Sequence, residues 1–339
     1  MRHVILSIVM WVLASFASAF EIEDRTVFGD ETDIAALRIV STADISYFKP
    51  IIDAFRAFRP DVTIDYTVAS STEVMNAIAL EKQPFDIVIS SAMDLQTKLA
   101  NDGFVQKHTS PATQDLPDWA VWNDMVYAFT QEPAGFVISN ALFDGLPIPH
   151  NRQQLITALR QNPDRFEGRV GTYDIRKSGA GYLFATQDAR ASDTYWRLTE
   201  VMGTLNPTLY CCASEMIDDV VNGDLAVAYN VLASYAEKSP HQDKFTIILP
   251  SDFSIVMLRT MLIPKISDNP VLAAEFLDFV LAQTYPSGVS SLLKTQSLNN
   301  AEQSTLYRIS MGPGLLVYLD YFKKKNFIAE WENAIVQDQ

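Results

Sequence analysis

Short strand-like segments alternate with amphipathic helical segments along most of the chain, and this alternation constrains the fold more than any other feature. Residues 62–68 place apolar side chains on one face at a period of two, as a strand does, and residues 50–58 place them at helical spacing. Ser70 and Glu73 form a capping-box pair that opens the next helix. The pattern predicts strands over 37–41, 62–68 and 85–90, and helices over 50–58, 70–80 and 93–101. This order indicates right-handed βαβ units on a parallel sheet.

The same alternation continues through the second half of the chain. The pattern predicts strands over 125–130, 137–139, 170–173, 226–229, 245–249 and 255–263, and helices over 151–161, 180–187, 193–203, 215–222, 270–281, 314–322 and 328–336. A length of 339 residues is about twice that of a typical domain. We therefore expect an α/β fold of two lobes joined by sheet strands, with a cleft between the lobes and hinges near 125–130 and 251–256.

The first residues have the pattern of a secretory signal peptide. Arg2 precedes an apolar run over 4–16, and the small residues 17–19 provide a cleavage site. We expect cleavage near Ala19, a mobile acidic leader over 20–36, and a protein exported to the periplasm. The sequence has 26 Lys and Arg against 41 Asp and Glu, a net charge of −15, which becomes −16 once Arg2 is removed. Such a chain has no basic face for nucleic acid.

Two cysteines are present, and they are neighbours, Cys211 and Cys212. They cannot make a disulfide framework, so the stability of the fold has to come from its core. Two interpretations stay open for the pair, a vicinal disulfide or two small residues packed in a loop. The three histidines after residue 20 are far from each other and from the cysteines in sequence, so we expect no metal site and no cofactor.

Small hydroxyl residues and glycines gather where strands give way to helices. They occur at 41–44 (STAD), 70–72 (SST), 90–92 (SSA), 176–181 (RKSGAG) and 213–214 (AS). In open α/β sheets, ligands bind beyond the carboxyl ends of the strands, where helix N-termini favour negative charge. Arg176, before the glycine-rich turn, adds a cation. These junctions predict a site for a small anion.

Serine chemistry is a weaker interpretation. S-x-x-K occurs at 46–49 and 291–294, and S-D-N at 267–269, as in penicillin-recognising hydrolases. However, Lys49 precedes Pro50, which disfavours the helix that would align Lys49 with Ser46. The K-T-G element lacks its glycine, and no G-x-S-x-G is present. We therefore expect that the protein is not an enzyme.

Several segments resemble the two-lobed type II periplasmic solute-binding proteins of ABC importers, in particular the ferric-ion-, sugar-phosphate- and phosphoglycerate-binding subgroup. The resemblance rests on 39–44 (IVSTAD), 86–95 (DIVISSAMDL), 171–184 (GTYDIRKSGAGYLF), 229–236 (YNVLASYA) and 308–320 (RISMGPGLLVYLD). It implies a first lobe over 37–126 and 256–339, a second lobe over 127–255, and a monomer. It also implies that the protein delivers a solute to an ABC-type permease or, as the alternative, presents it to a membrane sensor kinase.

The resemblance further implies which residues contact the solute. They are Thr42, Asp44, Ser70, Ser71, Ser90 and Ser91 in the first lobe, Ser178, Gly179, Ser214, Tyr229 and Asn230 in the second, and Arg259 at the cleft mouth. Ferric-ion binders of the subgroup use adjacent tyrosines, whereas Asn230 follows Tyr229 here and is a poor ligand for Fe(III). The expected ligand is therefore a sugar phosphate or a carboxylate rather than iron.

Overall fold

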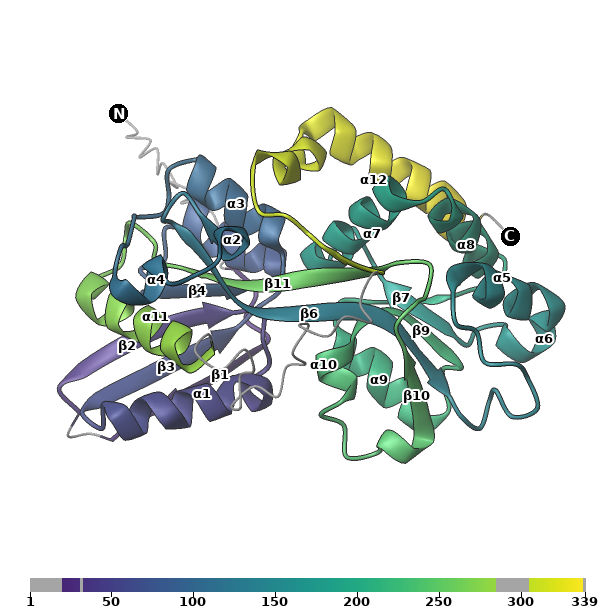
Figure 1. Ribbon diagram of the computed structural model, residues 1–339, viewed down its shortest axis with the longest axis horizontal. Helices are drawn as coiled ribbons and strands as arrows, with labels where there is room; N and C mark the ends of the chain where they lie inside the picture. Colours follow the sequence, from purple (N-terminus) through teal and green to yellow (C-terminus); the bar gives the residue numbers. More distant parts are fainter. Residues whose placement is uncertain (1–19, 31–32, 285–304, 338–339) are drawn as a thin grey trace, which may run out of the picture.

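The computed structural model describes residues 20–30, 33–284 and 305–337, which form two α/β lobes sharing one mixed sheet (Figure 1). The strands run in the order β1-β3-β2-β4-β11-β6-β9-β7-β8, so the predicted fold class is confirmed. The expected signal peptide, 1–19, and the second S-x-x-K, 291–294, lie outside the described residues. Within the described ranges, no helix has both the length and the apolar character to cross a membrane.

The first lobe is built on parallel strands with helices packed against them. β2 pairs in parallel with both β3 and β4, as the βαβ pattern predicts. Helix α1 packs on the sheet through apolar residues that recur at helical spacing, such as Phe48, Ile52 and Phe55. The elements of this lobe are β1 (Asp24–Phe28), β2 (Ala35–Ser41), α1 (Ile45–Phe58), β3 (Val62–Val68), α2 (Ser71–Ala79), β4 (Ile87–Ser90), α3 (Met93–Asn101), α4 (Pro111–Gln114), η1 (Asp118–Ala120), β5 (Val121–Trp122) and α11 (Pro270–Thr284).

Two long strands belong to both lobes. β6 (Val126–Ser139) and β11 (Ser254–Leu262) run side by side from one lobe to the other (Figure 1) and pair in antiparallel register. The sequence predicts two separate short strands over 125–130 and 137–139, but β6 is continuous because both of its faces are buried along its length. The hinge segments expected from the sequence lie at the start of β6 and on the approach to β11.

The second lobe repeats the plan of the first. β7 pairs in parallel with β8 and β9, and β9 and β10 pair antiparallel with β6. Its elements are α5 (Arg152–Gln161), α6 (Pro163–Phe166), β7 (Val170–Tyr173), α7 (Gly179–Ala191), α8 (Thr194–Gly203), β8 (Thr208–Tyr210), α9 (Ala213–Asn222), β9 (Val227–Leu232), α10 (Ala233–Ala236), η2 (Gln242–Lys244) and β10 (Phe245–Ile248).

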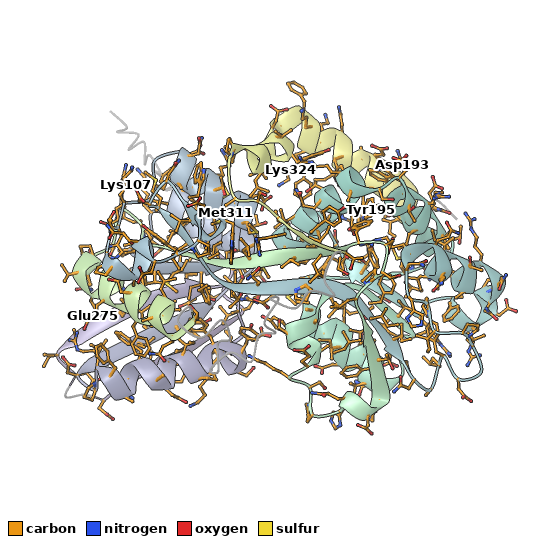
Figure 2. All side chains as sticks on the ribbon, in the orientation of Figure 1. Lys107, Asp193, Tyr195, Glu275, Met311 and Lys324 are labelled. Atoms are coloured by element: carbon orange, nitrogen blue, oxygen red, sulfur yellow. A yellow bond between two sulfur atoms is a disulfide. The ribbon has the colours of Figure 1, made fainter. Side chains whose placement is uncertain are left out.

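The C-terminal segment crosses from the first lobe to the second. It consists of β12 (Leu306–Arg308), η3 (Pro313–Leu319) and α12 (Tyr321–Ile335), and Met311 and Lys324 mark its course in Figure 2. η3 contacts α3 of the first lobe, whereas α12 lies along α8 and buries Phe327 and Trp331 in the core of the second. We therefore assign α12 to the second lobe, in contrast to the prediction that places all of 256–339 in the first.

The expected mobile leader also differs from the structure. Residues Asp24–Phe28 form strand β1, which pairs antiparallel with β3, and the Glu23 N–H donates to the carbonyl of Val68. Without β1, the outer edge of β3 would present unpaired backbone groups to solvent. Pairing with this edge orders a segment whose own sequence has no strong periodicity.

Candidate ligand-binding site

A small cavity of about 60 Å³ lies between the two lobes. The loops after β2, β3 and β4 form its first-lobe wall, the loops after β7 and β8 form its second-lobe wall, and Arg259 of β11 lies between them. The residues predicted from the sequence that line it are Thr42, Asp44, Ser70, Ser71, Ser91, Ser178, Ser214 and Arg259. The carboxyl ends of parallel strands thus bring these distant hydroxyl segments to one place.

Four helices begin at the cavity, two from each lobe. The residues that precede their first turns are Asp44 for α1, Ser70 for α2, Ser178 for α7 and Cys212 for α9. The Ser70 Oγ accepts a hydrogen bond from the N–H of Glu73 at 3.3 Å, and the Ser178 Oγ accepts one from Gly181 at 3.1 Å. The first N–H groups of each helix have no partner within the helix, and the helix dipole places partial positive charge there. This arrangement favours bound negative charge.

The lobes contact each other around the cavity. A Cβ atom on Gly179 of α7 would lie 2.7 Å from the Cβ of Ser71 of α2, so only glycine allows this approach of the two helices. The ring of Tyr47 in α1 stacks on Tyr235 in α10, with centroids 5.0 Å apart, and the Lys238 Nζ lies 3.3 Å from the Tyr47 centroid. These contacts hold the two walls of the cavity together.

Arg259 is fully buried and paired within the protein. Its Nε and Nη2 donate to the Glu132 carboxylate at 2.9 and 3.1 Å, and Thr130 and Ser234 also donate to that carboxylate. Burial alone would raise the pKa of Glu132, but Arg259 and these hydroxyl groups outweigh it and the pKa is lowered. The positive charge of Arg259 is therefore balanced before any solute enters.

A family model described as bacterial extracellular solute-binding protein matches residues 40–285, most of the chain. The chain belongs to this family. Its members are transport components without enzymatic activity, so the prediction that the protein is not an enzyme is confirmed. The family also implies a periplasmic location and delivery of a solute to an ABC transporter permease. A comparison with curated protein sequences found no match.

Similarity to solved structures agrees with the assignment of the chain to this family of solute-binding proteins. The chain is similar to the substrate-binding protein of an ABC transporter from Agrobacterium tumefaciens, with 30% identity, a TM-score of 0.85, and coverage of 92% of this chain and 98% of that one. The periplasmic binding protein AfuA from Actinobacillus pleuropneumoniae, solved with fructose-6-phosphate, is 17% identical, with a TM-score of 0.71 and coverage of 90% and 100%. A ferric binding protein from Campylobacter jejuni is 16% identical, with a TM-score of 0.64 and coverage of 88% and 99%.

Tyr229 and Asn230, which the resemblance implies as solute contacts, do not line the cavity of the binding protein. The Tyr229 hydroxyl donates to the Asp188 carboxylate at 2.7 Å and accepts from the Arg152 Nε at 2.8 Å. The Asn230 amide donates to the same carboxylate at 2.8 Å. Asp188 and Arg152 are both buried, so this network ties β9, α7 and α5 together inside the second lobe. The polar groups of Tyr229 and Asn230 thus form hydrogen bonds inside the second lobe and do not face the cavity.

Three further predicted residues lie outside the cavity wall. Gly179 serves the contact between the lobes, and the buried Ser90 hydroxyl accepts from the N–H of Ala92 at the start of α3. Arg176 does not line the cavity and pairs with Asp174 at 2.7 Å and with Glu332 of α12 at 3.2 Å. It lines a wider outer hollow of about 1170 Å³, which adjoins the cavity and shares Asp44, Ser70 and Ser214 with it. A second large hollow, of about 900 Å³ near Arg190, contains none of the predicted residues.

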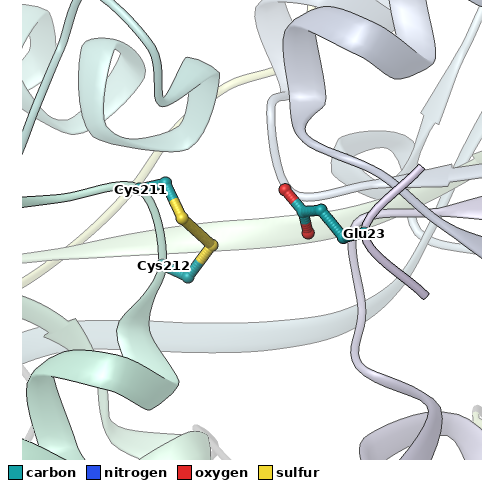
Figure 3. Close-up of side chains that lie close together, drawn as sticks. All are labelled: Glu23, Cys211 and Cys212. Carbon is teal, nitrogen blue, oxygen red and sulfur yellow. A yellow bond between two sulfur atoms is a disulfide. The ribbon is translucent and has the colours of Figure 1, made fainter. Parts of the chain in front are cut away.

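The mouth of the cavity contains three residues that the sequence does not predict as solute contacts. Cys211 and Cys212 are joined as a vicinal disulfide, which resolves the alternative left open by the sequence, and Glu23 faces them from the other lobe (Figure 3). The Glu23 carboxylate and the two sulfurs lie within 4.8 Å of one another. The thiolate is the form of cysteine that binds metal ions. Because Cys211 and Cys212 are joined in a disulfide, we do not assign these three residues as a metal site. No sequence signal places Glu23 here, because only the pairing of β1 with β3 brings it to the mouth.

Two carboxyl groups at the cavity have raised pKa values. Burial is the main cause for Asp44, and Arg259 and the Ser214 hydroxyl oppose it. Burial is also the main cause for Glu23, reinforced by the charges of Asp44 and Glu215. A raised pKa means that the charged carboxylate is destabilised at this position. A bound proton or a nearby hydrogen-bond donor would therefore stabilise either group.

Proposed function

We propose that the binding protein captures a small polar anion in the cavity between its lobes and delivers it to an ABC-type permease. The observation that carries this proposal is the convergence of four helix N-termini, from both lobes, on one cavity lined by hydroxyl groups. Backbone N–H groups and small hydroxyls bind oxyanions without requiring a free cation. Contacts from both lobes form together only when the lobes meet, so the solute would stabilise that arrangement.

The size of the cavity bears on the size of the solute. The cavity of about 60 Å³ has room for only a small group, and it adjoins the outer hollow of about 1170 Å³, which shares several of its lining residues, among them Asp44, Ser70 and Ser214. Inorganic oxyanions and short carboxylates are small groups of this kind. A hexose phosphate, such as the one bound to AfuA, is larger and would have to extend from the cavity into the outer hollow. We therefore take a short carboxylate or an oxyanion as the solutes to test first.

Iron is not the solute that we propose. The tyrosine implicated by the sequence resemblance, Tyr229, is buried and bonded to Asp188 and Arg152. Tyr173 and Tyr235 do line the cavity, but they are not adjacent in the chain as the paired tyrosines of ferric-ion binders are. Similarity at 16% identity to a ferric binding protein concerns the fold alone.

Filling the cavity tests the proposal. Ala180 lines the cavity in the first turn of α7, and Ala180→Leu would fill the cavity with a residue that helices tolerate well. Ala191→Leu, at the exposed end of the same helix, is the matched control. Phosphate, sulfate, glycolate and acetate would be titrated by calorimetry and thermal shift. We expect at least one anion to bind the wild type and the control but not Ala180→Leu. Binding by none of the four, or equal binding by Ala180→Leu, would contradict the proposal.

A further inference from the structure

Asp44 is an acidic residue that lines the cavity and is only partly buried. It precedes the first turn of α1, but its side chain makes no capping hydrogen bond to that helix. Its hydrogen-bonding neighbour is the Ser214 hydroxyl, which belongs to the other lobe and also lines the cavity. An ionised carboxylate accepts hydrogen bonds and donates none. Ser214 can fill only one of the roughly four lone-pair positions of this carboxylate, so the wall of the cavity still includes acceptor positions that the protein leaves open.

The charges around the cavity are not those of a simple anion trap. Among the described residues that line it, the charged ones are Glu23, Asp44 and Arg259. Arg259 is held in two hydrogen bonds by Glu132, and Arg176 is paired with Asp174 and Glu332. Lys177 does not line the cavity, although it lines the outer hollow together with Glu23 and Asp44. Within the cavity itself, no surplus positive charge compensates the two carboxylates. A solute with only acceptor oxygens would be repelled by the negative charge of Asp44. The lone pairs of the Asp44 carboxylate and of the solute oxygens facing it would then lack hydrogen-bond donors.

We infer that the solute carries an O–H donor beside its anionic oxygens and that Asp44 accepts this hydrogen bond. The inference rests on the proposed function and narrows its class of solute. The anionic oxygens would lie against the N-termini of α2, α7 and α9, and the O–H group would point to α1. The raised pKa of Asp44 agrees with a site that favours a proton next to this carboxyl group. Asp44 is then the residue that determines specificity.

Matched pairs of anions test the inference, because each pair differs chiefly in the donor. Near neutral pH, phosphate keeps at least one O–H group and sulfate has none, although their shapes are alike. Glycolate likewise has a hydroxyl group that acetate lacks. We expect the wild-type protein to bind phosphate more tightly than sulfate, or glycolate more tightly than acetate, by about tenfold or more, since an unsatisfied buried charged group is costly. The pair that discriminates shows whether the donor lies on the oxyanion itself or on a neighbouring carbon.

Asp44→Asn supplies the decisive comparison. The amide can donate as well as accept, so the variant should bind sulfate or acetate to within about threefold of its partner anion. Asp53→Asn, on the exposed face of the same helix, should keep the wild-type ratio. Equal binding of both members of each pair by the wild type would overturn the inference and leave the proposed function standing, as would an unchanged ratio in Asp44→Asn. Binding of none of the four anions would remove both. The wild-type ratios decide the question even if Asp44→Asn fails to fold.

Discussion

Replacing Asp94 with asparagine should stabilise the protein increasingly as the pH rises. Asp94 lies in the first turn of α3 and is only 3% exposed, and its Oδ1 has no hydrogen-bond partner. Burial raises the pKa of its carboxyl group to about 7, and the N–H groups of Leu95 and of Asp94 itself, together with the charge of Lys324, offset only part of that effect. Tyr182 of α7, whose own pKa is raised partly by Asp94, faces it from the second lobe.

The magnitude follows from the two pKa values. The ordinary pKa of 3.8 describes the unfolded chain, and about 7 describes the folded protein. Between these values the folded state binds more protons, so stability falls as the pH rises through this interval. One pKa unit is worth about 1.4 kcal/mol, so the raised pKa of Asp94 lowers the free energy of unfolding by roughly 2 kcal/mol at pH 5 and roughly 4 kcal/mol at pH 8. Asparagine has the same shape and no charge, so it removes this dependence.

Urea denaturation of wild type and Asp94→Asn at pH 5, 6, 7 and 8 measures the effect. The free energy of unfolding of the variant should exceed that of the wild type by an amount that grows by roughly 2–3 kcal/mol from pH 5 to pH 8. Asp102→Asn, at the other end of α3, is the control with the opposite sign: its pKa is lowered because Lys98 outweighs burial, so its loss should not stabilise the protein at pH 8. Parallel curves for wild type and Asp94→Asn across this range would refute the reasoning, as would a variant that is less stable at pH 8.

Three other expectations concern the contacts around the cavity. Gly179→Ala should weaken anion binding by about tenfold or more while barely changing the melting temperature without solute, because its Cβ meets Ser71 only when the lobes touch; calorimetry and small-angle scattering check this. Glu132→Ala should lower the free energy of unfolding by about 3–5 kcal/mol, measured in urea, because it leaves Arg259 buried and unpaired; a loss below 1 kcal/mol would contradict the pairing. The Cys211–Cys212 disulfide predicts no reactive thiol in the denatured protein before reduction and two afterwards, counted with a chromogenic thiol reagent.

The periodic parts of the fold were predictable because their signals are local. Alternation at a period of two and at helical spacing identifies β3 and α1, and the order of elements then implies a parallel sheet. The placement of Thr42, Ser70 and Ser91 at one cavity follows from the same rule, since the carboxyl ends of parallel strands meet at one edge. For these residues, the sequence and the topology together are sufficient.

Most of the other features depend on partners that are distant in sequence. Tyr229 and Asn230 lie within β9 and form hydrogen bonds with the Asp188 carboxylate, and Tyr229 also bonds with Arg152. Arg176 pairs with Glu332 of α12, which no local pattern reveals, and with Asp174, only two residues before it. The charge of Arg176 is therefore balanced by these two carboxylates. The leader was missed for the same reason: its order comes from the free edge of β3.

The acidity of the chain and an anionic solute are compatible only if the charges that repel the solute are separated from the groups that bind it. The sequence suggested that a few cations make this separation, but Arg259 is balanced by Glu132 and Arg176 by Asp174 and Glu332. Lys177 lines the outer hollow but not the cavity, so within the cavity the remaining source of positive potential is the backbone at the starts of the four helices. A helix dipole acts over about one turn, so it can attract an oxyanion in the cavity while the net charge of −15 acts at longer range outside it. The backbone then provides the affinity, and Asp44 distinguishes one anion from another.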